Sequence, residues 1–286
     1  MSEALRIRSG PFGRVALLDM DRSLVRHAHP HCHVLLKVEG ADTQFEVADR
    51  ITALTDESAV LIDAWTPHSY VHRPGAPRTV LLALYIEPTW LGEFRANWTA
   101  SAGAGFFRTP NGSITPEIRR MSRDLAESMV HAPGALKEHE AMLASLMIAV
   151  VERFSAWREV KPGLREAALS SGVDYRIARA IRLMRDRTWL HGSMNQLARE
   201  SGMSRANFFR VFERETGLTP RIYMNTMRVE QAVAQAVDQE TPFSAMAGEL
   251  GFSSPGHFTR FFAGHTGVPP SRFRQVVRLG ENETPG

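Results

Sequence analysis

Residues 1 to about 90 consist of short aliphatic runs separated by Gly, Asp or Pro. The clearest runs are RVALLDM, HVLLKV, TQFEVA, AVLIDA and TVLLALYI. Runs of this length, rich in Val, Leu and Ile and bounded by turn residues, are typical of β-strands. Because no helical pattern separates them, they predict a β-barrel or sandwich. Pro88 and the turns at Ser101–Gly105 and Thr109–Ser113 end this region.

The hydrophobic period changes after this β-rich part. Ile118, Met121, Leu125 and Met129 fall on one stripe of a helix. After a break at HAPG, a second helix carries a wider apolar face, formed by Leu136, Leu143, Leu146, Met147, Val150, Val151 and Phe154. The two helices are predicted to form a hairpin that packs on the barrel. The alternative is that the hairpin also forms the contact with a second subunit in a dimer. Residues 161–174 have the composition of a linker.

The rest of the chain contains one pattern twice. The sequence QLARESGMSRANFFRVFERETGLTP at 196–220 returns as AMAGELGFSSPGHFTRFFAGHTGVPP at 245–270. Ala198 and Gly202 recur 49 residues later, but Phe212 recurs 50 residues later, so the second copy holds one extra residue. Two copies are too few for a solenoid. An apolar helix, a turn at Gly and an amphipathic second helix are typical of a helix-turn-helix.

A helix-turn-helix places its second helix in the DNA major groove, with side chains near the N-terminus of that helix reaching the bases. In the first copy we predict this helix at about 205–215, with Phe208, Val211 and Phe212 inward. The residues predicted to face DNA are Ser204, Arg205, Ala206, Asn207, Phe209 and Arg210. Arg can bind guanine, Asn can bind adenine, and an aromatic ring can cover a thymine methyl group. For Phe209, packing on a neighbouring helix is the alternative.

The corresponding helix of the second copy is predicted at about 255–264, with its phenylalanines mostly inward and Ser253 or Ser254 as its cap. The residues predicted to face DNA are Ser253, Ser254, Gly256, His257 and Arg260. A connecting helix at about 221–240 would be about 30 Å long, close to the ~34 Å at which major-groove faces recur. Because the two copies carry unlike side chains, they predict an asymmetric DNA site.

Charge supports a nucleic-acid partner through its distribution rather than its total of +3. Residues 173–278 contain 15 Arg and no Lys against 9 Asp and Glu, a net charge of +6, which leaves −3 for the remainder. The single cysteine, Cys32, excludes an internal disulfide and fits a reducing cytoplasm. The sequence shows no signal-peptide pattern and no apolar run near the ~20 residues of a membrane span.

Residues about 174–277 resemble the DNA-binding domain of the AraC/XylS family of bacterial transcription regulators. The matching positions are Arg228 and Ala232 on the connecting helix and, in the second copy, Ala247, Gly251, Phe252, Ser254, Phe258, Arg260, Phe262, Gly267, Pro270, Phe273 and Arg274. The chain departs from the family at Ala263 and Gly264, where basic residues are usual, and at His257, where an aromatic is common. The resemblance implies binding to two adjacent major-groove segments of double-stranded DNA, control of a nearby promoter, and RNA polymerase as a partner.

Histidines mark the front part of the chain. His27, His29, His31 and His33 occupy alternate positions, which share one face of an extended strand. Together with Pro67-His68, this pattern resembles the cupin barrel that AraC-type regulators often carry as a sensor. The resemblance implies a small organic effector, for which the predicted binding residues are His29, His31, His33, Lys37, Trp65 and His68.

A metal site is the alternative for these histidines, because three or four imidazoles suit zinc, iron, copper or nickel. The acidic ligand expected a few residues after an HxH pair is missing, however, and position 37 holds Lys37. We therefore predict no metal and no cofactor, while a metal, or the loss of any ligand, stays open. Cys32 is predicted to be a buried, inert thiol rather than a redox group.

The predicted fold class is α+β multidomain. It comprises a cupin-like β-barrel (1–112), a helical hairpin and linker (113–173), an all-α domain with two helix-turn-helix units (174–278) and a tail (279–286). The predicted function is a cytoplasmic, non-enzymatic transcriptional regulator under effector control, an activator or a repressor, with homodimerisation left open. The alternatives are a metal-dependent cupin enzyme with an accessory nucleic-acid-binding domain, and a DNA-binding protein whose front domain only dimerises.

Overall fold

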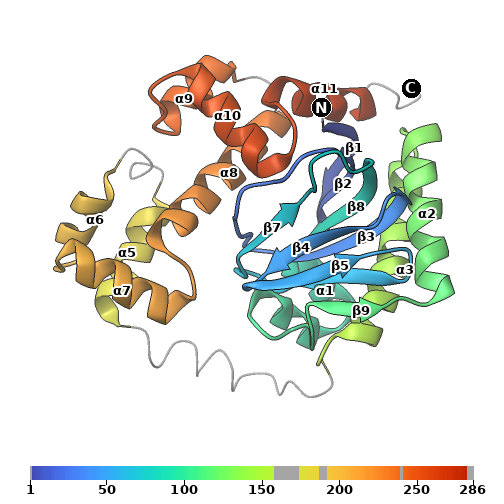
Figure 1. The fold of residues 1–286 in the computed structure, drawn as a ribbon, viewed down its shortest axis with the longest axis horizontal. Helices are drawn as coiled ribbons and strands as arrows, with labels where there is room; N and C mark the ends of the chain where they lie inside the picture. Colours follow the sequence, from blue (N-terminus) through green and yellow to red (C-terminus); the bar gives the residue numbers. More distant parts are fainter. Residues whose placement is uncertain (1, 158–173, 187–191, 239–240, 282–286) are drawn as a thin grey trace. The chain divides into compact units, whose positions relative to one another are not determined.

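The computed structural model describes residues 2–157, 174–186, 192–238 and 241–281 (Figure 1). Contacts divide the chain into two units, one formed by residues 1–160 and 263–286 and the other by residues 161–262. The predicted linker lies outside the described residues except for Asp174. None of the helices in the described ranges is long and apolar enough to cross a membrane.

The front part of the first unit is made of two antiparallel sheets. In the described part of the chain, the larger sheet has the strand order β1-β2-β8-β3-β6-β9 and the smaller one β5-β4-β7. The strands are β1 (Glu3–Gly10), β2 (Gly13–Met20), β3 (Cys32–Gly40), β4 (Thr43–Val47), β5 (Arg50–Leu54), β6 (Ser58–Ile62), β7 (His68–Val71), β8 (Thr79–Ile86) and β9 (Asn111–Ser113). All five aliphatic runs of the sequence fall on these strands, so the predicted β-rich domain is confirmed.

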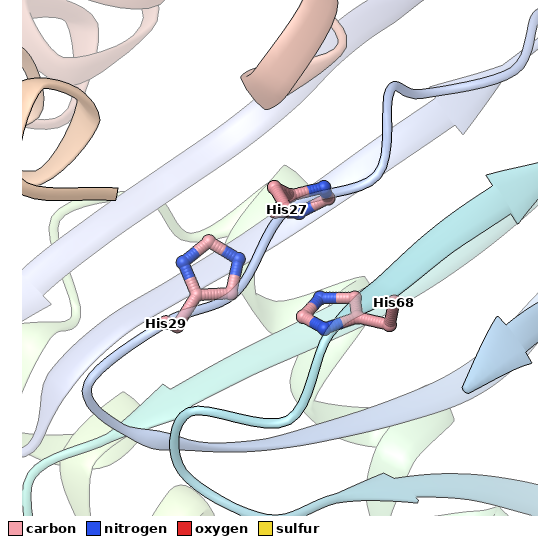
Figure 2. Close-up of side chains that lie close together, drawn as sticks. All are labelled: His27, His29 and His68. Carbon is pink, nitrogen blue, oxygen red and sulfur yellow. The ribbon is translucent and has the colours of Figure 1, made fainter. Parts of the chain in front are cut away.

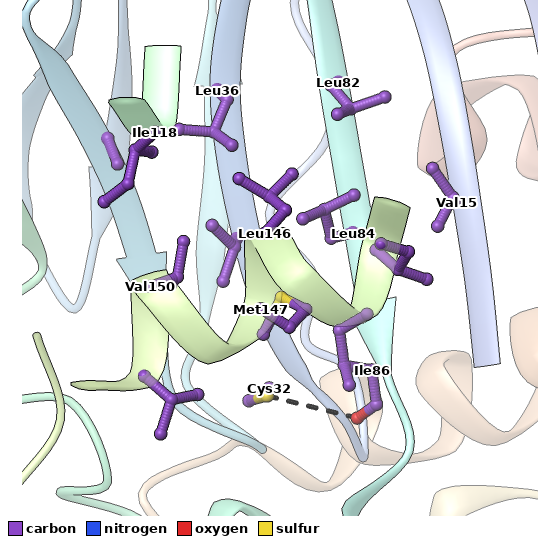
Figure 3. Packing of buried hydrophobic residues seen from close by; sticks show 14 of the residues in the cluster. Val15, Cys32, Leu36, Leu82, Leu84, Ile86, Ile118, Leu146, Met147 and Val150 are labelled. Carbon is purple, nitrogen blue, oxygen red and sulfur yellow. Dashed lines mark hydrogen bonds between the residues drawn. The ribbon is translucent and has the colours of Figure 1, made fainter. Parts of the chain in front are cut away.

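The two faces of the larger sheet differ in chemistry because successive side chains of a strand point to opposite faces. One face is aliphatic and carries Val15, Val34 and Leu84, which are buried in the main hydrophobic core. Helix α3 covers this face with Leu146 and Met147 (Figure 3). The opposite face carries buried polar side chains.

Helices α2 (Pro116–His131) and α3 (Leu136–Phe154) form the predicted hairpin, and they lie along the strands (Figure 1). Thr115 caps α2 by accepting a hydrogen bond from the Ile118 amide, a contact worth about 1 kcal/mol. Leu136, which was predicted on the apolar face, is 46% exposed at the first turn of α3. After the predicted end of the β-rich region at Pro88, the chain forms helix α1 (Pro88–Phe94) and a 3₁₀ helix (Ala96–Ala102), neither of which was predicted from the sequence. Proline is compatible with the first helical turn, where its missing N–H has no partner to lose.

The second unit is helical. It contains α5 (Tyr175–Arg185), α6 (Met194–Glu200), α7 (Arg205–Thr216), α8 (Pro220–Asp238) and α9 (Phe243–Glu249). Helix α10 (Pro255–Thr266) begins in this unit, whereas α11 (Pro270–Glu281) belongs to the first unit, where it packs against β1. The connecting helix α8 has 19 residues and is therefore about 28 Å long.

Candidate functional site

The two helix-turn-helix turns begin with the same backbone geometry. The amide of Met203 donates to the Ala198 carbonyl at 2.9 Å, and the amide of Phe252 donates to the Ala247 carbonyl at 2.8 Å. Gly202 has φ +69° and the equivalent Gly251 has φ +78°. These left-handed conformations favour glycine, because a Cβ atom is strained there. The sequence repeat is therefore a repeat of the turn itself.

A serine caps the second helix of each helix-turn-helix. The Ser204 hydroxyl accepts a hydrogen bond from the Asn207 amide at 3.4 Å, and the Ser254 hydroxyl accepts one from the His257 amide at 3.3 Å. The turn between α6 and α7 covers residues 201–204, and the turn between α9 and α10 covers residues 250–254. The extra residue of the second copy thus lies in the turn, and Ser254 rather than Ser253 is the cap.

The outer face of α7 presents a short row of hydrogen-bonding side chains. Arg205 and Arg210 are exposed, and Asn207 is half-buried between them. An Arg210 Nη atom donates to Asn207 Oδ1 at 2.8 Å, and an Arg205 Nη atom donates to Asn195 Oδ1 at 2.6 Å. These pairings hold the guanidinium groups near the N-terminal half of the helix, where base contacts are made in this motif.

Ser204 and Ala206 are exposed beside this row, and Phe209 is half-buried. The guanidinium carbon of Arg205 lies 5.2 Å from the Phe209 ring centroid. Phe209 also contacts the buried Phe208 edge to face, at 6.0 Å between centroids. Phe209 therefore packs within its own helix while one side of its ring remains near the outer face.

Helix α10 offers different chemistry at the equivalent positions. Gly256, His257 and Arg260 are exposed, and Ser254 is half-buried. The hydroxyl of Ser253 lies 2.7 Å from His257 Nδ1, which ties the imidazole to the turn. A Cβ atom at Gly256 would meet nothing closer than 3.9 Å, so this glycine leaves open space on the helix surface. The recognition surface of the second helix-turn-helix therefore has one arginine, whereas that of the first has two.

Buried aromatic rings hold both recognition helices in place. Phe208 and Phe212 of α7, and Phe258 and Phe262 of α10, have no exposed surface. The Phe212 ring also contacts Tyr223 of α8, at 5.6 Å between centroids. The inward phenylalanines predicted from the repeat are therefore in the core, with the exception of the half-buried Phe261.

A second polar cluster lies inside the barrel. His27, His29 and His68 are buried, and one ring nitrogen of each lies within 4.8 Å of those of the other two. Figure 2 shows the three rings around a common space, two from the segment before β3 and one from the start of β7. His33 of β3 adjoins them, with its ring centroid 5.5 Å from those of His29 and His68. Four imidazoles therefore converge, three of them from the run of alternate histidines and the fourth from His68.

The fourth member of the cluster is not the one predicted, because His31 points elsewhere. Residues 27–31 precede β3 and bend at Pro30 and His31 rather than continuing as a strand. The strict alternation of side chains ends at this bend. Nε2 of His31 lies 2.8 Å from the Glu87 carboxylate, outside the cluster. His27, which was not among the predicted effector-binding residues, takes its place.

Burial controls the charge of these imidazoles. Removal from water is the largest cause that holds the pKa of His29 and His33 well below the ordinary value, and nearby positive groups add to it. Burial likewise lowers the pKa of His68 to about 3. All three rings are therefore neutral at pH 7, and each keeps a nitrogen lone pair that can accept a hydrogen bond or bind a cation.

A row of side chains that the sequence analysis missed crosses the inner face of the larger sheet. In the strand register Arg14 of β2 lies opposite Tyr85 of β8, which lies opposite His33 of β3. The Arg14 guanidinium stacks on Tyr85 at 4.0 Å from the ring centroid, and Tyr85 stacks on His33 at 4.1 Å between centroids. This row places a buried cation close to the imidazoles.

The other two residues predicted to bind an effector occupy different surroundings. Lys37 lies four residues beyond His33, about 13 Å along the strand, and its ammonium group binds Asp42 at 2.6 Å and Asp56 at 3.0 Å. Burial alone would lower the pKa of Lys37, but these two carboxylates outweigh burial and raise it. Trp65 has a φ of +63°, and its amide donates to the His29 carbonyl at 2.7 Å. Trp65 thus adjoins the histidines through its backbone.

Two family models match the chain, and they cover different parts of it. The AraC-like ligand binding domain matches residues 16–144. The Helix-turn-helix domain matches residues 197–276. The first match contains the barrel and most of the helical hairpin, and the second contains both helix-turn-helix units.

Similar proteins include three bacterial regulators. An uncharacterised HTH-type transcriptional regulator of Haemophilus influenzae is 33% identical over 86 residues, which are 30% of this chain and 29% of that protein. HTH-type transcriptional regulator ExsA of Pseudomonas aeruginosa is 27% identical over 164 residues, 57% of this chain and 56% of that protein. Multiple antibiotic resistance protein MarA of Escherichia coli is 27% identical over 90 residues, 32% of this chain and 71% of that protein. The chain thus spans less than two thirds of the length of the first two relatives.

The fold as a whole is similar to that of ToxT from Vibrio cholerae. An apo ToxT structure has a TM-score of 0.53 and 13% identity, covering 94% of this chain and all of that one. A ToxT structure with bound unsaturated fatty acid has a TM-score of 0.51 and 13% identity, covering 92% of this chain and 94% of that one. At this identity, the likeness concerns the fold alone.

Proposed function

Because the chain belongs to the AraC family in both its ligand-binding and its helix-turn-helix domain, we propose that it is a transcriptional regulator that binds promoter DNA. The observation that carries this proposal is the duplicated turn, with matching Ala198 and Ala247 hydrogen bonds and an exposed arginine on each following helix. Each recognition helix would enter the major groove with its capped N-terminus toward the DNA.

In this proposal the first helix-turn-helix contributes most of the base recognition. Arg205, Asn207 and Arg210 offer the donor and acceptor groups that distinguish guanine and adenine in the major groove. Ser204, Ala206 and Phe209 complete its surface. In the second helix-turn-helix, Arg260 and His257 would reach the bases. The small side chains at the start of its recognition helix, those of Ser253, Ser254 and Gly256, would allow the helix N-terminus to approach a phosphate. The operator would therefore be asymmetric.

We propose that the barrel is a sensor whose ligand binds at the cluster of His27, His29, His33 and His68. The cluster is buried, polar and close to the cation of Arg14, features that are typical of a binding pocket rather than of a barrel core. The fold can hold a small molecule, since ToxT has been solved with an unsaturated fatty acid. Ligand binding would regulate transcription by favouring one of two arrangements of the protein with different DNA affinity.

Three further parts of the proposal concern assembly and location. RNA polymerase would be the partner at the promoter, and the protein would act in the cytoplasm. Homodimerisation would use the outer side of α2 and α3, where Leu136 is exposed while the inner side covers the sheet. Sedimentation equilibrium of the full chain tests the dimer, which Leu136→Glu should dissociate.

We also infer regulation rather than catalysis, because the named relatives are transcriptional regulators. Selection of bound duplexes from a random DNA pool, followed by fluorescence anisotropy, tests the function directly. The expected result is one preferred asymmetric site with a dissociation constant in the range of about 10⁻⁸–10⁻¹¹ M. Binding without sequence preference, or turnover of a small substrate in the absence of DNA binding, would contradict the proposal.

A further inference from the structure

The ring nitrogens of His27, His29 and His68 form an arrangement that nothing in the barrel core requires. All three residues are buried, and one nitrogen of each lies within 4.8 Å of those of the other two (Figure 2). Their ring centroids are 4.4 to 5.3 Å apart. Histidine is fully buried less often than aliphatic residues, so three buried imidazoles in one cluster indicate a specific use.

Backbone contacts fix which nitrogen of these rings bears the proton. Nδ1 of His27 lies 2.6 Å from the Val25 carbonyl, and Nδ1 of His68 lies 2.9 Å from the Thr66 carbonyl. A carbonyl only accepts hydrogen bonds, so Nδ1 carries the hydrogen in both rings and Nε2 carries the lone pair. Metal-binding histidines are typically held in this way, with the second ring nitrogen donating to a backbone carbonyl or a carboxylate.

The Nε2 atom of His68, which carries the lone pair, is buried and has no hydrogen-bond partner among the described residues. A buried acceptor without a partner costs stability, and such atoms are rare in folded proteins. Coordination of a cation would satisfy this atom and would explain why it faces the other imidazoles.

From this geometry we propose that His27, His29 and His68 bind a divalent late first-row transition-metal ion such as zinc. Three imidazoles are a sufficient ligand set, because zinc sites with three histidines and one open position are well established. A carboxylate near position 37 is therefore not needed, and Lys37 is in any case engaged by Asp42 and Asp56. Imidazole ligands select zinc, copper, iron or nickel over magnesium and calcium.

The distances are compatible with coordination after a small contraction. Zinc–nitrogen bonds of 2.0–2.1 Å in a tetrahedral site separate the nitrogens by about 3.3 Å. The three nitrogens, now within 4.8 Å, would each approach the ion by rotation of the imidazole side chains. His33 is not a member of this group of neighbouring ring nitrogens, and its ring stacks on Tyr85 at 4.1 Å between centroids.

The fourth coordination position would hold water or an anionic group. The Arg14 cation on Tyr85 is near the cluster and favours negative charge there over a neutral ligand. The inference thus deepens the proposed sensor role by naming the class of ligand, and its regulatory meaning rests on that role. The metal site itself does not depend on DNA binding.

Metal binding to the full chain, prepared without an affinity tag and stripped by a chelator, tests the proposal. Isothermal titration with ZnCl2 should give one equivalent bound at pH 7. Cobalt(II) in the same site should give the intense visible absorption of a tetrahedral ion with nitrogen ligands. His68→Gln and His29→Gln should each weaken binding more than about 100-fold, since even loss of an outer hydrogen-bond partner costs 10- to 100-fold.

His31→Gln is the matched control, because His31 belongs to the same histidine run but binds Glu87 instead. This variant should retain the titration and the cobalt spectrum. Circular dichroism of each variant shows whether the barrel is folded. If His68→Gln does not fold, His29→Gln and the cobalt spectrum of the natural chain still decide the question.

Two results would overturn the metal site. One is a natural chain that binds no zinc and gives only the octahedral spectrum of aqueous cobalt. The other is unchanged affinity in folded His29→Gln and His68→Gln variants. Fluorescence anisotropy with operator DNA separates these failures from failure of the proposed function, because a protein that binds operator DNA but no metal is still a regulator and lacks only the metal site.

Discussion

The recognition helices and the barrel histidines use polar side chains in opposite ways. Arg205, Arg210 and Arg260 are exposed, and each lies within a few residues of the serine that caps its helix. The histidines are buried, and the fold brings together two stretches of the sequence, residues 27–33 and His68, to form their cluster. The exposed groups carry full charge in water, whereas His29, His33 and His68 are held neutral by burial.

This difference separates two kinds of recognition. Charged groups in water act at long range and attract a polyanion, but salt screens them. Neutral groups that are buried act only at contact, and the ligand that they select depends on their lone pairs and on the distances between them. The comparison therefore assigns DNA affinity to the helices and ligand choice to the barrel.

The largest effect expected from this comparison is on salt dependence. A protein that neutralises 6–10 phosphates loses about 10³- to 10⁵-fold in DNA affinity between 50 and 200 mM salt, because its binding releases counterions. The 15 arginines of residues 173–278 supply enough cations for such contacts. Fluorescence anisotropy with the preferred duplex over this range measures the slope.

Zinc binding over the same salt range is the counterpart measurement. It should change by less than about tenfold, because buried groups are screened much less than exposed ones. A flat salt response for DNA would contradict the role assigned to the exposed arginines. A steep response for zinc would instead show that the ion binds at the surface.

The recognition helices could be predicted from the sequence because their determinants are local. Gly202, Ser204 and Phe208 lie within seven residues, and the same order of small, capping and aromatic residues recurs in the second copy with one residue more. The structure extends the predicted helix ends by only one or two residues, to Thr216 and Thr266. Caps and turns act within a few residues of chain, so sequence spacing contains almost all of the information.

The barrel site could be predicted only in part, because its geometry depends on strand register. The row of Arg14, Tyr85 and His33 exists because β2, β8 and β3 are neighbours with one particular pairing. A shift of one residue would move Arg14 to the other face of the sheet, and no local pattern fixes that register. The position of His31 outside the cluster, unlike the strand register, has a local signal in the sequence. Pro30 precedes His31, and proline interrupts regular strands.

A second large effect is expected at Cys32, which tests how closed the barrel core is. Burial is the main cause that raises the pKa of this thiol to about 12, and the nearby Asp63 adds to it. At pH 8 the thiolate fraction should be on the order of 10³-fold lower than in an unfolded chain with an ordinary pKa. Alkylation by iodoacetamide, followed by mass spectrometry, should be slower by at least that factor.

The chain unfolded in urea is the matched control, because Cys32 is its single cysteine. Labelling should accelerate as pH rises toward 12, since the thiol loses its proton only there. Rapid labelling of the folded protein at pH 8 would mean that the core beneath α3 opens readily. The contrast between a closed barrel and exposed helices would then fail.

The smallest effect in this series distinguishes the two recognition helices from each other. Arg210→Ala and Arg260→Ala should each weaken binding to the preferred site by about 1–3 kcal/mol and relax base choice at one position. The loss should be greater for Arg210, because Asn207 Oδ1 holds its guanidinium in place at 2.8 Å. Anisotropy with duplexes that vary one base pair at a time measures both quantities.

Arg214→Ala is the control for a change of charge alone. Arg214 is exposed on α7, but it lies near the C-terminus of that helix and binds Glu215 at 2.5 Å. Its loss should lower affinity for all duplexes alike and leave base preference intact. If Arg210→Ala and Arg260→Ala behave like Arg214→Ala, the arginines contact only phosphates, and the unlike surfaces of the two helices do not specify an asymmetric operator.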